Sequence, residues 1–286
     1  DLKPNDAWAI AHRGETYRLM GEYARALADF DRIVQLMSDA PWAVAARGDA
    51  YRLSERYDEA LSDLNRALAL EPGMTQVIGN RGRVYRVLER YDESLADFNR
   101  AIELEPGDSW SFAGRGETHR LMGHFPEALA DFNRTLEMDP NSAWPLAQRG
   151  RVHLALRQFQ KALADFDRAI DLDPDDDWCY YQRAMPRRAS EPGSPWPDDL
   201  DRAVAIATEA HQTNPANLRN LFNLALYRVA QGDGHAAEAL YREGLAAGPA
   251  APTRRDALRD LDEYLALFPD DALAARMRAL LAGEGP

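Results

Sequence analysis

The sequence predicts an all-α fold, a solenoid of about seven helix-turn-helix repeats with a C-terminal helical cap. Three observations predict it: the chain repeats itself every 34 residues, each period holds two amphipathic segments, and a proline closes most periods. The period is clearest in an Arg-Gly pair. That pair recurs at Arg13-Gly14, Arg47-Gly48, Arg81-Gly82, Arg115-Gly116 and Arg149-Gly150.

Each period reads as two helices joined by a short break. In the first period, apolar residues recur at three- and four-residue spacing on both sides of Met20-Gly21-Glu22. Gly14 and Ala26 are small enough to let the two helices approach closely, and the ring of Phe30 fills the space between them. The unit is therefore a packed helical hairpin.

Prolines end the second helix of most units and turn the chain into the next one. They stand at Pro4, Pro72, Pro106, Pro140 and Pro174, with Ser38 where one is missing. Because a single helix pair cannot bury its apolar face alone, the units must stack on one another.

These positions resemble the tetratricopeptide repeat family, whose 34-residue pattern has a small residue, an aromatic, an alanine, an aromatic and a closing proline at the same offsets. The match covers residues 7–174, as five regular repeats. The resemblance implies a right-handed α-solenoid. This chain departs from the family pattern in having arginine for leucine before the glycine, and no tryptophan at the first aromatic position.

The remaining segments depart from the period. Residues 1–6 are expected to be the end of a preceding repeat or a linker. Residues 175–215 are expected to form an irregular sixth repeat with a proline-rich insertion, its second helix running from Asp199 to Gln212. Residues 216–249 fit a degenerate seventh repeat. Residues 250–286 fit C-terminal capping helices with a polar outer face.

Composition narrows the functional classes. The formal net charge of -13 repels phosphate backbones and anionic lipids, so neither nucleic acid nor membrane is an expected partner. There is no apolar run long enough to cross a bilayer. Cys179 is the only cysteine, which fits a reducing compartment, and a cytoplasmic location is expected.

No catalytic or metal motif is recognisable, so we expect neither an enzyme nor a cofactor. The run from Asp171 to Asp177 lacks the glycine and glutamate of a calcium loop and fits a solvated turn that caps the next helix. Cys179 has no histidine partnered to it in the sequence. His119 and His153 replace the tyrosine of earlier repeats and are expected to be packed rings.

The arginine of each Arg-Gly pair has a carboxylate 16 residues later, a separation that takes one helix back alongside the other. The carboxylates are Asp29, Asp63, Asp97, Asp131 and Asp165. Because they recur in every regular unit, we interpret these pairs as structural ion pairs within each repeat.

Tryptophan recurs at the second position of the first helix in five of six consecutive units, and Gln76 stands in the gap. In the tetratricopeptide repeat family this position lines the inner, concave groove. The candidate partner-binding residues on that face are Trp8, Arg18, Trp42, Arg52, Gln76, Arg83, Arg86, Trp110, Arg120, Trp144, Arg151 and Trp178. Alternatively, each tryptophan only seals the joint between neighbouring repeats, and Glu15-Arg18, Asp49-Arg52 and Glu117-Arg120 are only pairs within one helix.

The third repeat is distinctive because Arg83 and Arg86 have no acid between them. Together with Arg52, Arg120 and Arg151 they form a local basic opening on an acidic chain. We expect an acidic or C-terminal peptide to anchor there. The family's carboxylate clamp for chaperone tails is not expected, because its lysine and asparagine positions hold other residues.

The sequence thus predicts a protein-protein interaction scaffold that binds a peptide or protein segment in the concave groove, as the docking or sensing module of a larger, bacterial protein. Two alternatives stay open. The chain could self-associate through an uncapped N-terminal repeat, or it could bind a small planar ligand on the tryptophan ladder.

Overall fold

The chain was analysed as a computed structural model that describes residues 6–190 and 196–283. Within these ranges it is all-α, with sixteen helices and no strand. The helices form two compact units, Asp1–Met138 and Asp139–Pro286, called here unit 1 and unit 2. The expected segment 1–6, apart from Asp6, and the proline at position 4 lie outside the described residues.

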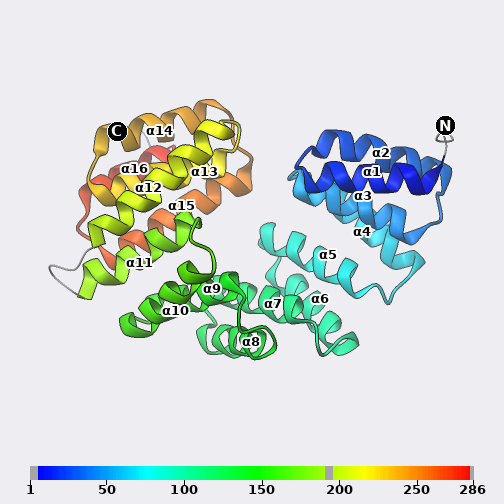
Figure 1. Cartoon of the computed structure of the whole chain (residues 1–286), viewed down its shortest axis with the longest axis horizontal. Coiled ribbons are helices and arrows are strands. Elements are labelled where there is room, and N and C mark those ends of the chain that lie inside the picture. The colour runs from blue at the N-terminus through cyan, green and yellow to red at the C-terminus, as the bar shows by residue number, and fades with distance from the viewer. Residues whose placement is uncertain (1–5, 191–195, 284–286) are drawn as a thin grey trace. The chain divides into compact units, whose positions relative to one another are not determined.

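Unit 1 contains four helix pairs that pack in chain order, each helix against the next (Figure 1). The first helices of the pairs are α1 (Ala7–Leu19), α3 (Pro41–Leu53), α5 (Thr75–Val87) and α7 (Ser109–Leu121). The second helices are α2 (Tyr23–Leu36), α4 (Tyr57–Leu70), α6 (Tyr91–Leu104) and α8 (Phe125–Met138). The predicted break at Met20-Gly21-Glu22 separates α1 from α2.

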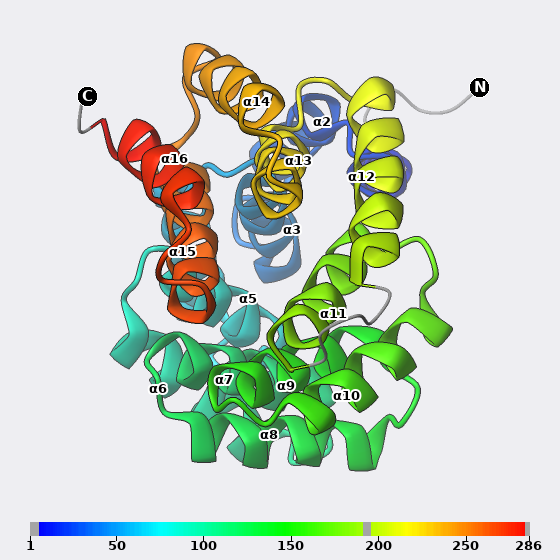
Figure 2. The same cartoon turned by 90° about the vertical axis from the view of Figure 1, so that its left-hand side faces the viewer.

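Unit 2 contains four further pairs (Figure 2). Its helices are α9 (Ala143–Ala155), α10 (Phe159–Leu172), α11 (Asp177–Ser190), α12 (Trp196–Thr213), α13 (Leu218–Gln231), α14 (Gly234–Ala246), α15 (Ala251–Leu267) and α16 (Ala272–Ala282). Helices α9 to α14 pack in chain order. Helices α15 and α16 both pack against α13, and α16 also packs against α14.

A glycine of the first helix packs against a large apolar side chain of the second helix in each regular pair, a phenylalanine ring in four of the five and Leu64 in the second. A Cβ atom added at Gly14 would lie 3.0 Å from Cε1 of Phe30, so the glycine permits a close approach of the helices that a larger residue would crowd. Phe30 and its counterpart Phe98 are fully buried. The close approach expected from the Arg-Gly repeat is therefore present, with the ring packed on the glycine.

The turn between the two helices of each regular repeat needs a residue with positive φ. Gly21 and Gly123 occupy it in the first and fourth repeats. Glu55, Glu89 and Arg157 occupy it in the others, with φ of 61°, 59° and 55°. A side chain in this left-handed region costs about 1 kcal/mol relative to glycine, so these three turns carry strain that the glycine turns avoid.

The predicted ion pairs between the two helices of each repeat are present. Arg81 donates from Nε to Asp97 Oδ2 at 2.8 Å and from Nη2 to Oδ1 at 2.6 Å. The same bidentate pattern joins Arg13–Asp29, Arg47–Asp63, Arg115–Asp131, Arg149–Asp165 and Arg183–Asp199. The sixth repeat thus also has this pair, which the sequence predicts only for the five regular repeats.

At least four of these arginines also reach back to the preceding repeat. Nη1 of Arg47 donates to Asp31 at 2.8 Å, and Nη1 of Arg81 donates to Asn65 at 2.8 Å. Arg115–Asn99 and Arg183–Asp167 repeat the contact at 2.7 Å and 2.8 Å. Each of these guanidinium groups therefore bridges two successive second helices, a role beyond the pairing within one repeat that the sequence suggested.

The sixth repeat absorbs its irregularity without losing the helix pair. Helix α11 continues through Pro186, which lies in its last turns and removes only one helical hydrogen bond. Helix α12 begins at Trp196, earlier than the expected Asp199, with Pro197 in its first turn. Pro192 and Pro195 lie outside the described residues.

Helix α15 contacts the first helices of three successive pairs. It packs on α13, its Tyr264 hydroxyl accepts a hydrogen bond from Arg188 of α11 at 2.6 Å, and its Glu263 pairs with Arg151 of α9. Leu261 and Tyr264 belong to the same buried cluster as Leu154 and Tyr181. Within unit 2, α15 therefore packs over the candidate residues Arg151 of α9 and Trp178 of α11, whereas Trp144 of α9 stays exposed.

Candidate protein-interaction face

Nine of the twelve candidate residues lie on the first helices of unit 1, or at their ends, and three lie in unit 2. We call the unit 1 set, from Trp8 to Arg120, the first-helix face. Two of its tryptophans are among the most exposed large apolar side chains of the chain, Trp8 at 68% and Trp110 at 63%. Large exposed aromatic rings on a folded surface are typical of interaction sites.

The first two tryptophans stack on each other. The ring centroids of Trp8 and Trp42 are 5.7 Å apart and their planes differ by 9°. The stack joins the first helices of two successive repeats, as the joint-sealing alternative expects. It also leaves Trp8 mostly exposed, so the sealing contact and an open aromatic surface coexist at this position.

The arginines nearest this stack are neutralised by acids of the same face. Arg18 donates to Glu15 at 2.7 Å and approaches Asp49 at 3.4 Å. Arg52 pairs with Asp49 at 2.8 Å. The first two repeats therefore present balanced charge on this face.

Arg83 differs from these arginines because no carboxylate of the described residues lies within ion-pair distance of it. Its guanidinium carbon lies 5.5 Å from the centre of the Trp110 ring, a cation-π contact. Burial, followed by the charges of Arg52 and Arg86, lowers the pKa of Arg83 to about 10. At neutral pH the group is still a cation, held in a poorly solvated place among other cations.

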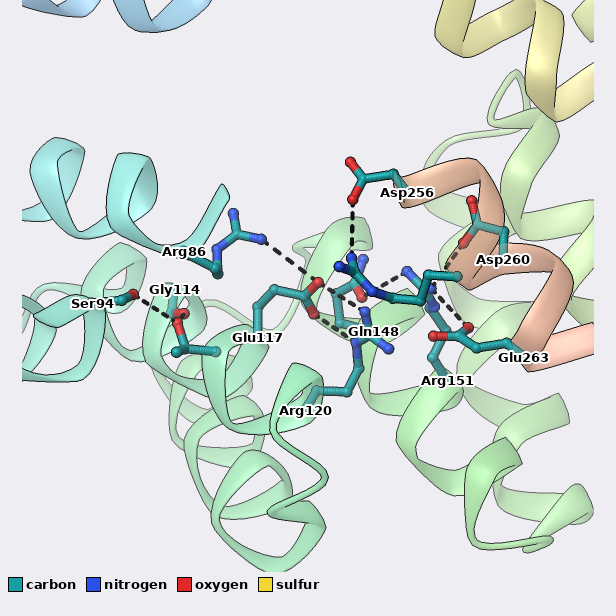
Figure 3. Close-up of polar contacts among 12 residues, drawn as sticks. Arg86, Ser94, Gly114, Glu117, Arg120, Gln148, Arg151, Asp256, Asp260 and Glu263 are labelled. Atoms are coloured by element: carbon teal, nitrogen blue, oxygen red, sulfur yellow. Dashed lines mark hydrogen bonds and ion pairs between the residues drawn. The ribbon is translucent and has the colours of Figure 1, made fainter. Parts of the chain in front are cut away.

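The neighbouring arginines of the predicted basic opening do have acid partners (Figure 3). Arg86 approaches Glu117 at 3.7 Å, and Arg120 donates to the same carboxylate at 2.8 Å. Glu117 thus offsets two cations. The basic opening predicted from the sequence is reduced in unit 1 to a single arginine without an ion pair, Arg83.

In unit 2 the corresponding residues are already engaged within the chain (Figure 3). Arg151 donates to Glu263 at 2.9 Å and lies 3.6 Å from Asp260, both on α15. Its guanidinium carbon is 5.4 Å from the centre of the Trp178 ring, which packs against Tyr181 and Tyr227. Trp144 differs from Arg151 and Trp178, because its side chain is 42% exposed.

Sequence reasoning did not find Asp260 and Glu263 as partners of Arg151, because more than a hundred residues separate them in the chain. The only available signal was an acidic pair one helical turn apart on the C-terminal helix. The charges of that region instead predict a polar outer face of the C-terminal cap.

The acidic, cysteine and histidine side chains that the sequence offers as candidates for chemistry make contacts that stabilise the fold. Asp176 accepts hydrogen bonds from the backbone N–H groups of Trp178 and Cys179, at 2.9 and 3.2 Å, so it caps α11 as expected. Burial raises the pKa of the Cys179 thiol, which donates to Asp176 and stays protonated. His153 is buried, with Nδ1 2.9 Å from Gln158 Oε1.

In residues 6–190 and 196–283 there is no group of three or more histidine, cysteine or acidic side chains placed to hold a metal ion. The helices in these ranges also include none with the length and apolar character needed to cross a bilayer.

Family models of the tetratricopeptide repeat match residues 41–74, 74–141 and 143–176. No curated protein sequence gives a significant match. Similar solved structures include PilW, described as a widely conserved type IV pilus biogenesis factor, with 17% identity and a TM-score of 0.60. The alignment covers 73% of this chain and 94% of PilW.

PilF of Pseudomonas aeruginosa is also similar, with 17% identity and a TM-score of 0.58, covering 79% of this chain and 99% of that one. A chain of the APC/C hetero-tetramer Cut9-Hcn1 gives 13% identity and a TM-score of 0.62, covering 94% of this chain and 48% of that one. At these identities the likeness concerns the fold alone. Together with the repeat geometry, the family matches identify this chain as a member of the tetratricopeptide repeat family.

Proposed function

We propose that this chain is a non-enzymatic scaffold whose first-helix face binds an acidic segment of another protein. Tetratricopeptide repeats are protein-interaction modules, so the coarse role follows from the family. The observation that carries the finer proposal is Arg83, a partly buried cation that lies over an exposed tryptophan and has no carboxylate of the described residues in ion-pair distance.

A desolvated cation without a counter-ion is unfavourable, and a carboxylate brought to it relieves that cost. Trp110 supplies apolar area beside the charge, and aromatic and arginine side chains are the residue types that dominate binding hot spots. The chain as a whole carries a net charge of -13. Long-range attraction therefore does not draw an acidic partner in, and recognition depends on this local contact.

The test selects short random peptides by display on the immobilised full-length chain and then measures their affinity in solution by fluorescence anisotropy. Selected peptides should be rich in Asp and Glu. Arg83→Glu, alone and with Arg86→Glu, should weaken them about tenfold or more, as expected for loss of a charge-assisted hydrogen bond and its replacement by repulsion.

The matched control is Arg134→Glu, which changes charge equally but at an exposed position on the second helix α8. Selected peptides that bind the Arg83→Glu chain as tightly as the original would overturn the proposal. So would an equal loss of affinity in the control variant, because that would indicate a non-specific charge effect.

A further inference from the structure

Arg83 and Arg151 occupy the same position of the repeat, two periods apart, and so do Trp110 and Trp178. In both places an arginine of one first helix lies over the tryptophan of the next, with the guanidinium carbon 5.5 and 5.4 Å from the ring centre. The chain therefore contains two copies of one arginine-tryptophan element, one in each unit.

In unit 2 the element is occupied by a helix of the chain itself. Asp260 and Glu263 of α15 lie 3.6 and 2.9 Å from Nη2 of Arg151 (Figure 3). These two carboxylates are three residues apart, which places them on one face of a helix. The residue after each of them, Leu261 and Tyr264, is buried in the cluster against which Trp178 packs.

In unit 1 the element lacks such an acid. Asp49 and Asp108 are the acids that act on Arg83 electrostatically, and neither is within ion-pair distance. Trp110 is 63% exposed, whereas Trp178 is partly buried by its neighbours. The copy in unit 1 therefore presents both the cation and the apolar ring that α15 uses in unit 2.

From this comparison we infer that the Arg83–Trp110 element binds an acidic α-helix of a partner protein, which presents two carboxylates three residues apart, each followed by an apolar residue. This inference rests on the proposed function and specifies its partner. Helical form follows from the spacing, because in an extended segment residues three apart point to opposite faces.

The probe is a synthetic peptide of residues 251–267, the sequence of α15, held helical by a staple on its outer face and labelled for anisotropy. Two companion peptides accompany it. One carries Asp260→Asn with Glu263→Gln, and the other is unstapled with Leu265→Pro, which breaks the helix without changing its charge.

The stapled peptide should bind the full-length chain, and Arg83→Gln should weaken it about tenfold or more. Arg134→Gln, the control on α8, should leave the affinity unchanged. Both companion peptides should bind at least about tenfold more weakly than the parent.

Three results would overturn the inference: no binding of the stapled peptide, equal binding of the Leu265→Pro peptide, or a loss caused by Arg151→Gln rather than Arg83→Gln. The last would mean that the probe displaces α15 from its own place. If any of these occurs while displayed acidic peptides still depend on Arg83, the helical partner is wrong and the proposed function stands. If the displayed peptides are also independent of Arg83, both fail.

Discussion

Gly114 offers a sharp test of the packing in unit 1. A Cβ atom at this position would lie 2.4 and 2.5 Å from Cζ and Cε1 of Phe98, well inside van der Waals contact. The ring has little room to retreat, because Phe98 is fully buried and also packs close to Gly82, where a built Cβ would lie 3.3 Å from Cζ. Phe98 is thus fixed between glycines of α5 and α7.

Two opposing effects decide the result of Gly114→Ala. Overpacking of a closed core costs about 1–3 kcal/mol, and a contact this short, on a fully buried ring, belongs at the upper end. Alanine in place of glycine inside a helix returns about 1 kcal/mol. We therefore expect Gly114→Ala to lower the free energy of unfolding by about 1–2 kcal/mol.

Gly79→Ala is the matched control, since it lies inside α5 and its new Cβ would meet nothing closer than the Ser111 hydroxyl at 3.8 Å. This variant should gain about 0.5–1 kcal/mol from helix propensity alone. Urea unfolding followed by circular dichroism would measure both. Equal stabilisation by the two substitutions would refute the argument that Phe98 is trapped.

Two further predictions concern buried or partly buried polar groups. Burial lowers the pKa of His119 and His153 below the ordinary value of 6.5. The unfolded chain therefore takes up these protons first, and stability is full above about pH 6.5 and falls as the pH drops below it. Replacing both with tyrosine, the residue of the first three repeats, should flatten that dependence in urea unfolding, and an unchanged slope would contradict it. The buried Tyr241 hydroxyl has no hydrogen-bond partner among the described residues, whereas Tyr227 donates to Asp177 at 2.6 Å. In thermal unfolding, Tyr241→Phe should raise stability by about 1 kcal/mol and Tyr227→Phe should lower it by about 1–2 kcal/mol, and the opposite order would show that the Tyr241 hydroxyl is satisfied.

The period made the local architecture predictable. Helix α1 ends before the expected break and helix α2 begins after it. The contact between Gly14 and Phe30 and the bidentate pair between Arg81 and Asp97 also lie where the 34-residue spacing predicts them. These features repeat because each depends on contacts within one hairpin. A position such as Gly114 was not predictable, because its counterparts in other repeats carry side chains and only the three-dimensional path of Phe98 shows why this one cannot.

The candidate face was predictable as a set of residues but not as a distribution of charge. Sequence spacing grouped Arg83, Arg86 and Arg151 as one basic opening. Which of them retains an unmatched charge depends on acids from other helices, Glu117 for Arg86 and the pair on α15 for Arg151. Such contacts join distant parts of the chain, and no local periodicity encodes them.

The arginines that bridge successive second helices have a consequence for how the array unfolds. In a one-dimensional description, each repeat has an intrinsic stability and each junction has a coupling free energy. Arg81 and Arg115 couple neighbouring repeats by a hydrogen bond to a neutral asparagine amide, and Arg47 and Arg183 couple them by an ion pair to an aspartate. Salt screens such contacts where they are partly exposed. Added salt should therefore broaden the unfolding transition and let terminal repeats open before their neighbours.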